Sequence, residues 1–167
     1  MSATHLFPEK LLLHFHADKW CPCGTATTIR KTRRKTIATV NTGEFEAKET
    51  QTFCKSCQQT FGSDELRSLT PQRGKFGFDV IEYIGRSLFV QCRNEREIQA
   101  ELATRNITIS AREIGFLSKR FIVYLALAHQ QCQAELKQYM QSKGGYILHM
   151  DGTCEGDSPH LFSCMDE

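Results

Sequence analysis

Alternating polar and apolar positions predict a β-hairpin in the first third of the chain. Residues 36–41 are β-branched and alternate, and the Asn41-Thr42-Gly43 segment that follows them is typical of a turn. Residues 45–53 alternate again and place every second residue on one face: Phe45, Ala47, Glu49, Gln51 and Phe53. The pattern therefore predicts two strands joined by a tight turn.

Helical spacing replaces this alternation in the middle of the chain. Residues 63–69 predict a short helix that ends before Pro71, and residues 72–75 read as a linker. In residues 76–92, apolar side chains recur at helical intervals and form one broad face: Val80, Ile81, Ile84, Leu88 and Phe89. Gly85 weakens this helix slightly.

Two capping motifs mark the starts of the next helices. Residues 94–97 and 110–113 each place a cap residue three positions before a glutamate, which is the spacing of a capping box. The first motif predicts a helix over residues 95–104, and the second predicts a helix that begins at Ala111. From there the helical pattern is nearly continuous to about Gln141.

The two capped helices and their short connection resemble a helix-turn-helix unit. In that interpretation the early residues of the second helix face DNA: Arg112, Lys119 and Arg120. A plain three-helix packing unit is the alternative. The exposed apolar residues of the long helix are compatible with either a packed core face or a surface for a partner helix.

An apolar segment predicts a further strand near the end of the chain. Residues 146–150 read as a buried strand, and Asp151-Gly152-Thr153 follows at once. A carboxylate at a strand end beside a glycine suits Mg²⁺ binding, since Mg²⁺ prefers oxygen ligands. An ordinary Asp-Gly turn is the alternative. Residues 161–165 predict a second strand that pairs with the first.

Four of the eight cysteines form two close pairs. One residue separates Cys21 from Cys23, and two residues separate Cys54 from Cys57. Two thiolate pairs brought together complete a tetrahedral zinc shell, and the hairpin between them resembles a zinc ribbon. The first spacing is one residue short for a ribbon, so we expect a distorted loop or a ligand from elsewhere, for which His16 is the nearest candidate. Four unliganded buried thiols are the alternative.

Charge is distributed unevenly along the chain. The net charge of +2 combines +5 over residues 1–75, +2 over residues 76–144 and −5 over residues 145–167. The densest run of cations is Arg30, Lys31, Arg33, Arg34 and Lys35. Such a run can neutralise phosphates and release counterions, with a solvated strand or loop as the alternative. A basic front and an acidic end suggest a polyanion partner at the front and different chemistry at the other end. Beside a zinc ribbon the run favours contact with nucleic acid, and the expected partner is double-stranded DNA.

Composition excludes several classes of protein. The chain has 167 residues, of which 40% are hydrophobic and 24% charged, so neither wholesale disorder nor a collagen-like repeat is expected. The longest apolar stretch, residues 121–128, is much shorter than the roughly 20 residues of a membrane span. The N-terminus does not have the pattern of a signal peptide. We therefore expect a cytoplasmic, nucleoid-associated protein without a membrane segment.

The order of these features resembles the front end of a DDE-type transposase of a bacterial insertion sequence. The resemblance rests on the two cysteine pairs, the helix starts at Asn94 and Ser110, and residues 146–153. It implies an α+β chain in three parts: a zinc-ribbon-like module at 1–75, a helix-turn-helix-like module with a long helix at 76–144, and the start of an RNase H-like domain at 145–167. In that family three carboxylates hold two metal ions for phosphoryl transfer, and Asp151 would be the first of the three.

Only 16 residues follow Asp151, whereas a complete catalytic domain needs on the order of 100. We therefore expect a truncated, catalytically incomplete transposase-like protein that binds insertion-sequence ends. It would contain structural zinc, use magnesium only in a full-length form, and form a homo-oligomer or associate with a full-length transposase. One alternative is a complete zinc-ribbon and helix-turn-helix transcriptional regulator. Another is a small metal-dependent hydrolase that uses Asp151, Asp157 and His160.

Overall fold

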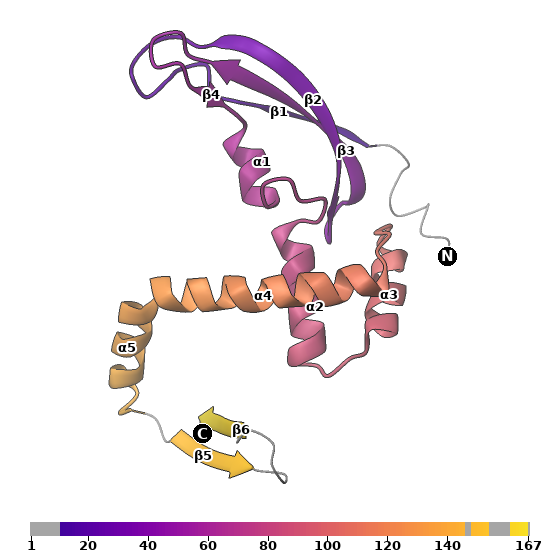
Figure 1. Cartoon of the computed structure of the whole chain (residues 1–167), viewed down its shortest axis with the longest axis vertical. Coiled ribbons are helices and arrows are strands. Elements are labelled where there is room, and N and C mark those ends of the chain that lie inside the picture. Colours follow the sequence, from indigo (N-terminus) through magenta and orange to yellow (C-terminus); the bar gives the residue numbers. More distant parts are fainter. Residues whose placement is uncertain (1–10, 146–147, 154–160, 167) are drawn as a thin grey trace. The chain divides into compact units, whose positions relative to one another are not determined.

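A mixed sheet forms the first part of the chain in the computed structural model, which describes residues 11–145, 148–153 and 161–166 (Figure 1). The central strand β3 (Gly43–Phe53) pairs antiparallel with β2 (Thr28–Thr39) and parallel with β1 (Leu12–His16). The short strand β4 (Thr60–Phe61) pairs with the end of β3. The predicted hairpin is confirmed, although β2 begins at Thr28 rather than at Thr36.

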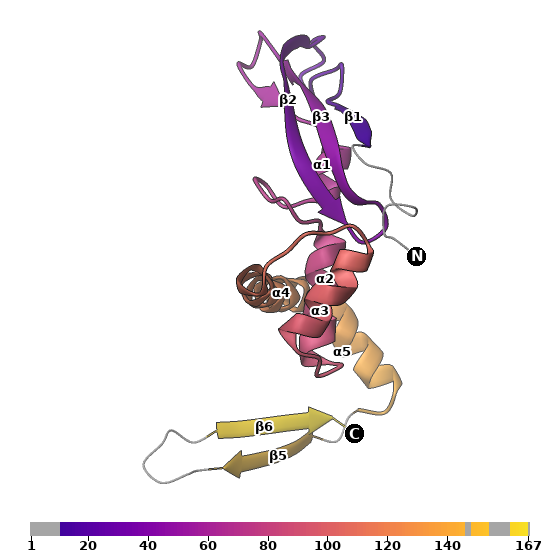
Figure 2. The same ribbon diagram turned by 90° about the vertical axis from the view of Figure 1, so that its right-hand side faces the viewer.

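One face of this sheet is covered by helix α1 (Asp64–Leu69), as Figures 1 and 2 both show. The alternation of β3 produces this face, because every second side chain of a strand points to the same side. The buried cluster beneath α1 contains apolar residues from three strands and the helix: Phe15, Ile37, Phe45, Ala47 and Leu66. The Ser63 side chain caps α1 and accepts a hydrogen bond from the backbone N–H of Leu66 at 3.3 Å, so the predicted short helix is confirmed.

Three helices follow the sheet: α2 (Phe78–Phe89), α3 (Glu95–Thr104) and α4 (Ala111–Gln131). Figure 2 views α4 almost end-on, with α2 and α3 beside it. Both capping boxes are formed, so α3 and α4 begin at the predicted residues. The helices bury a largely aliphatic core: Val80, Ile81, Ile84, Ile98, Leu102, Ile107, Ile109, Ile114 and Leu117. The predicted face of α2 is wrong at its end, because Phe89 is 53% exposed.

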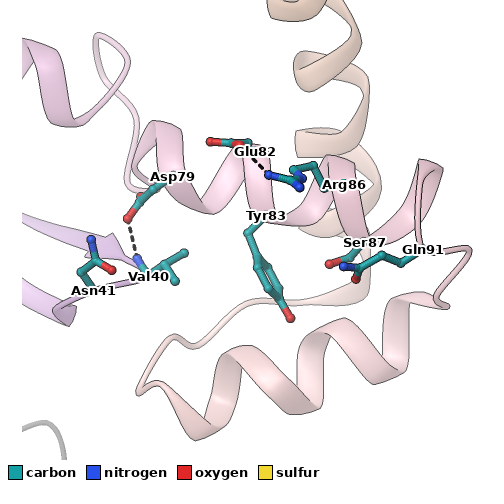
Figure 3. A pocket seen from close by; sticks show the side chains of 8 residues that line it. All are labelled: Val40, Asn41, Asp79, Glu82, Tyr83, Arg86, Ser87 and Gln91. Carbon is teal, nitrogen blue, oxygen red and sulfur yellow. Dashed lines mark hydrogen bonds and ion pairs between the residues drawn. The ribbon is translucent and has the colours of Figure 1, made fainter.

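The sheet and the helices are joined by polar contacts across the predicted linker. Asp79 of α2 accepts a 2.7 Å hydrogen bond from the backbone N–H of Val40 in the β2–β3 turn (Figure 3). Lys75 donates to the Glu44 carboxylate at 2.7 Å, and the same carboxylate oxygen accepts from the backbone N–H of Thr108. These contacts place residues from both predicted modules, 1–75 and 76–144, in one compact unit, Met1–Val123.

The second compact unit, Tyr124–Glu167, contains the end of α4, helix α5 (Gln133–Ser142) and the strands β5 (Leu148–Thr153) and β6 (Leu161–Asp166). The prediction of a nearly continuous helix to about Gln141 is wrong at Cys132. There the backbone ψ of 9° departs from the helical value of about −42°. The predicted pairing of the two terminal strands is confirmed as an antiparallel ladder.

None of the described helices combines the length and apolar character that a membrane crossing requires.

Candidate metal centre

Two loops bring the four paired cysteines together. The first loop connects β1 with β2 and contains Cys21 and Cys23, and the second connects β3 with β4 and contains Cys54 and Cys57. The end of β1 and the start of β2 both pair with the last part of β3. The β1–β2 loop therefore lies at the same end of the sheet as the β3–β4 loop. Hydrogen bonds inside each loop close them: Cys21 N–H donates to the carbonyl of Thr25 at 3.0 Å, and Cys54 N–H donates to that of Gln59 at 2.9 Å.

The sulfur atoms have the spacing of a four-thiolate metal site. Sγ of Cys21 lies 3.3 Å from Sγ of Cys57, and Sγ of Cys23 lies 3.6 Å from Sγ of Cys54. All four sulfurs lie within 4.8 Å of one another. A tetrahedral zinc ion with Zn–S bonds of about 2.3 Å separates its sulfur ligands by roughly 3.8 Å. The four cysteines therefore have the composition and spacing needed to bind one metal ion.

The backbone after each pair turns through the left-handed region. Gly24 follows Cys23 with φ of 82°, and Gln58 follows Cys57 with φ of 56°. Both loops thus have a left-handed residue directly after the second cysteine of the pair, although the first pair is one residue shorter. The Gly24 N–H donates to the carbonyl of Cys21 at 2.8 Å and so closes the short turn. The expected distortion is thus absorbed within the loop, and no histidine belongs to the cluster among the described residues.

Backbone N–H groups face all four sulfurs. Each lowers the pKa of the thiol that it contacts: Cys23 N–H for Cys21, Thr25 N–H for Cys23, Cys57 N–H for Cys54 and Gln59 N–H for Cys57. Hydrogen bonds to the charged form favour thiolates, which are the metal-binding form of cysteine. These N–H groups favour negative charge on the sulfurs, and the pKa of Cys54 is lowered overall. At Cys57 the Cys21 thiol also lowers the pKa, but the Cys54 thiol and burial outweigh these contacts and raise the pKa overall.

The thiols also influence one another strongly. The Thr25 hydroxyl, 3.5 Å from Sγ of Cys23, and then the Cys21 thiol lower the pKa of Cys23 to about 6. At Cys21 the N–H of Cys23 is outweighed by burial and the neighbouring thiols, which together raise the pKa to about 12. Four adjacent thiolates repel one another, so a divalent cation is the group that allows all of them to ionise together.

Two polar residues of the second loop, Ser56 and Gln58, support the site although the sequence did not single them out. Thr25 Oγ1 lies 3.1 Å from Ser56 Oγ, which joins the first loop to the second beside the sulfurs. Gln58 donates from its side-chain amide to the carbonyl of Lys55 at 2.8 Å and so supports the left-handed turn. No pattern in the sequence indicated these roles of Ser56 and Gln58.

The basic run lies on β2, at the edge of the sheet. Two of its cations pair with carboxylates of β3: Arg33 with Glu49 at 2.9 Å and Arg34 with Glu46 at 3.1 Å. The run is therefore partly neutralised by its own sheet. Both carboxylates come from β3, and the sequence did not indicate that they would pair with the basic run.

The other three cations of the run are in different environments. Lys35 is half-buried and donates to the Thr70 hydroxyl at 3.1 Å, and its burial lowers its pKa. Arg30 lies 5.6 Å over the Phe53 ring. Lys31 is exposed and has no ion pair among the described residues. The five cations thus do not act as one uniform polycation.

The candidate DNA-facing residues lie on the first half of α4. Arg112 and Lys119 are exposed, and Arg120 is half-exposed with its guanidinium 5.9 Å over the Phe116 ring. The opposite side of the helix is buried through Ile114 and Leu117. The structure therefore places these cations on an accessible helix, well separated in sequence from the cysteine cluster.

Asp151 lies inside a strand rather than after one. Strand β5 extends through Thr153, and Asp151 is opposite Ser163 of β6. The start of the predicted strand, residues 146 and 147, lies outside the described residues, as do Asp157 and His160. In the described part of the chain, the cysteine cluster is the one group of metal-ligating side chains that are gathered together.

No protein family, no curated protein and no solved structure matches this chain in the comparisons.

Proposed function

We propose that the chain binds double-stranded DNA, with zinc in the four-cysteine cluster and helix α4 as the main DNA-contacting element. The observation that carries this proposal is the two-sided character of the first half of α4. Ile114 and Leu117 are buried, whereas Arg112 and Lys119 are exposed. A helix held in this way presents cations at a fixed orientation, as the second helix of a helix-turn-helix unit does.

The spacing of the exposed residues supports contact with a duplex. Arg112 and Lys119 are seven residues apart, so they lie on the same side of the helix and about 10.5 Å apart along its axis. Phe116 lies between them and is 59% exposed. The major groove of B-DNA admits an α-helix, and Arg and Lys are the usual partners of phosphates and guanine edges.

Zinc is the metal that best suits the cluster. Four thiolates in tetrahedral spacing are the usual ligands of structural zinc in small modules. When bound, the ion would be held by Cys21, Cys23, Cys54 and Cys57 and would fix the two loops at the end of the sheet. Its proposed role is structural, because a closed four-cysteine shell leaves no position for a substrate.

The basic strand contributes a secondary contact in this proposal. Arg30 and Lys31 lie next to the metal loops and have no carboxylate partner among the described ion pairs. Arg33 and Arg34 already pair with glutamates, so their contact with phosphates would have to replace existing ion pairs. We therefore assign less of the DNA affinity to β2 than its cation count suggests.

The narrower proposal is a transposase-like protein that binds insertion-sequence ends and has no catalytic activity of its own. It rests on the sequence resemblance, in which Asp151 is the first carboxylate of the triad and magnesium belongs to the full-length form. Selecting bound fragments from genomic DNA tests it. Recovery of inverted repeats at the ends of a mobile element supports it, whereas recovery of promoter operators favours a transcriptional regulator.

The broader proposal is tested by fluorescence anisotropy with a labelled duplex at about 50 mM salt. We expect the logarithm of the association constant to fall linearly with the logarithm of the salt concentration, with a slope of about −0.9 for each phosphate contact. The double variant Arg112→Glu/Lys119→Glu should reduce that slope by about 2 and weaken binding. Lys137→Glu, which changes an exposed cation on α5, is the control. Absence of binding by the unmodified protein at this salt concentration overturns the proposal.

A further inference from the structure

A second region of positive charge lies in a cavity between the loop before α2 and the first half of α4. The cavity has a volume of about 210 Å³. The residues that give it its chemical character are three cations, two phenylalanines and one carboxylate: Arg73, Lys75, Arg120, Phe76, Phe116 and Glu113. Nothing in the sequence pattern indicated that Arg73 and Arg120 would line the same cavity.

The single carboxylate of this cavity, Glu113, already accepts hydrogen bonds from the helix cap. Glu113 Oε2 accepts from the backbone N–H of Ser110 at 3.0 Å and from its hydroxyl at 2.9 Å, as part of the α4 cap. The backbone N–H of Ser110 in particular lowers the pKa of Glu113. Lys75 is bound to Glu44, outside the cavity. Glu113 and Lys75 are thus both held by contacts with other residues. Arg73, by contrast, is exposed and has no ion pair among the described residues.

Arg73 is held in an unusual backbone conformation. The Gly74 N–H donates to the carbonyl of Pro71 at 2.8 Å, which closes a four-residue turn with Arg73 at its third position. Its φ is 63°, a value that favours glycine or asparagine at this position of a turn. An arginine here costs conformational energy that glycine would avoid. The turn does, however, direct a cation to the edge of the cavity.

The other described cavity provides a contrast. It has a volume of about 290 Å³ and lies beside the β2–β3 turn and α2 (Figure 3). There Asp79 accepts the Val40 N–H, and Glu82 pairs with Arg86 at 3.4 Å. Its charged groups therefore all have partners, whereas Arg73 of the other cavity has no ion pair among the described residues.

We propose that the cavity beside Arg73 binds a phosphate group, and, resting on the proposed DNA-binding function, that the phosphate belongs to the DNA backbone. Guanidinium groups bind phosphate oxygens through paired N–H donors. Phe116 connects this site to the exposed side of α4, because it lines the cavity and lies between Arg112 and Lys119 on the helix. A backbone phosphate in the cavity would thus fix the position of α4 on the duplex.

The test uses the full chain and the variant Arg73→Asn. Asparagine tolerates the left-handed backbone, so this change removes the charge without straining the turn. Arg86→Gln removes an equal charge at the other cavity and is the matched control. The first measurement is a titration with inorganic phosphate, at ionic strength matched with sodium chloride, that follows the backbone amide resonances of Gly74, Lys75 and Phe76. The second is the salt dependence of duplex binding.

We expect phosphate, but not chloride, to shift these amide resonances, and Arg73→Asn to abolish the shifts. The same variant should reduce the salt slope of duplex binding by about 0.9, while Arg86→Gln leaves it unchanged. Phosphate-specific shifts without a change in slope assign the site to a free phosphate ligand instead of DNA. If the unmodified chain also fails to bind duplex, the proposed function fails while the phosphate site stands. Absence of phosphate-specific shifts together with an unchanged slope overturns this inference and leaves the proposed function intact.

Discussion

At the scale of single residues, Gly85 shows how one position couples two helices. The sequence indicated only that this glycine weakens α2. The structure places the Phe121 ring of α4 directly against it, so that a Cβ at this position would overlap the ring atoms. Phe121 also stacks with Phe89 at a centroid distance of 6.3 Å. The glycine is thus required for close packing of α2 against α4.

Gly85→Ala should therefore destabilise the protein, even though alanine favours helices. The overlap with Phe121 forces the helices to shift, and we expect a cost of about 1–3 kcal/mol in the free energy of unfolding. Gly115→Ala in α4 is the matched control, since its added Cβ meets only the flexible Glu95 carboxylate, at 3.3 Å. That change should stabilise by about 0.5–1 kcal/mol. Urea unfolding measures both, and equal effects of the two changes would contradict the assigned role of Gly85.

Glu101 supports the contact between α2 and α3 through its charge. Its carboxylate pairs with Arg93 at 2.6 Å and Arg105 at 3.7 Å. The Tyr83 hydroxyl and then Arg93 lower the pKa of Glu101. Because the folded-state pKa lies below the unfolded value of about 4.3, this contribution to stability is present above that pH. It is lost as the pH falls through the folded-state pKa.

Glu101→Gln should consequently reduce stability at pH 7, by about 1 kcal/mol after allowance for partial exposure. The difference from the unmodified protein should shrink as the pH is lowered from about 5 towards 3. Glu82→Gln is the control. The Glu82 carboxylate pairs with Arg86 and is more exposed than that of Glu101, so this change should alter stability little at any of these pH values. Thermal unfolding across this pH range checks both, and a pH-independent loss for Glu101→Gln would show that its charge has no part in the effect.

At the scale of elements, the local signals were the most informative. The starts of α3 and α4 could be predicted to the residue, because a capping box is formed by side chains three positions apart and needs no tertiary partner. The hairpin turn was predicted at residues 41–43 and lies one residue earlier, between Thr39 and Gly43. In the candidate site, the cysteine pairs could be identified for a similar reason, since each pair lies within one loop.

Non-local pairing is what the sequence did not reveal. Strand β1 is parallel to β3 and far from it along the chain, so no local pattern indicated their register. Strand β2 also includes the basic run, and two of its arginines pair with Glu46 and Glu49 of β3, which no local pattern indicated. The cavity beside Arg73 was missed for the same reason, as its walls come from two separate segments. The break at Cys132 has no glycine or proline to indicate it.

The α4 cap gives an element-scale prediction. Ser110 accepts from the Glu113 N–H at 3.2 Å, and Glu113 accepts in return from the Ser110 N–H and hydroxyl. Ser110→Ala removes both bonds of the hydroxyl and should cost about 1 kcal/mol in the free energy of unfolding. Ser110→Thr keeps a capping oxygen and should retain most of that stability. Urea unfolding compares the variants, and an equal loss for threonine and alanine would contradict a capping role.

At the scale of the whole molecule, the cysteine cluster and the hydrophobic cores lie in different parts of the first unit. The cysteines hold the β1–β2 and β3–β4 loops, whereas Ile37, Phe45 and Leu66 pack elsewhere in the sheet. The helices have their own aliphatic core. Metal loss should therefore affect one end of the unit first. The effect of metal removal on the loops can therefore be measured while the helical core stays folded.

We expect the purified protein to contain about one zinc ion per chain, and Cys54→Ser to lose it. Cys92→Ser and Cys132→Ser are matched controls, because both thiols are exposed and lie outside the cluster. Removal of the metal by a chelator should increase amide hydrogen exchange in residues 19–27 and 54–60, since these loops depend on the thiolate ligands. Amides of α2 and α3 should remain protected, because their core does not include the site. Equal metal content in Cys54→Ser and Cys92→Ser, or exchange that increases uniformly along the chain, would contradict a metal centre with this local structural role.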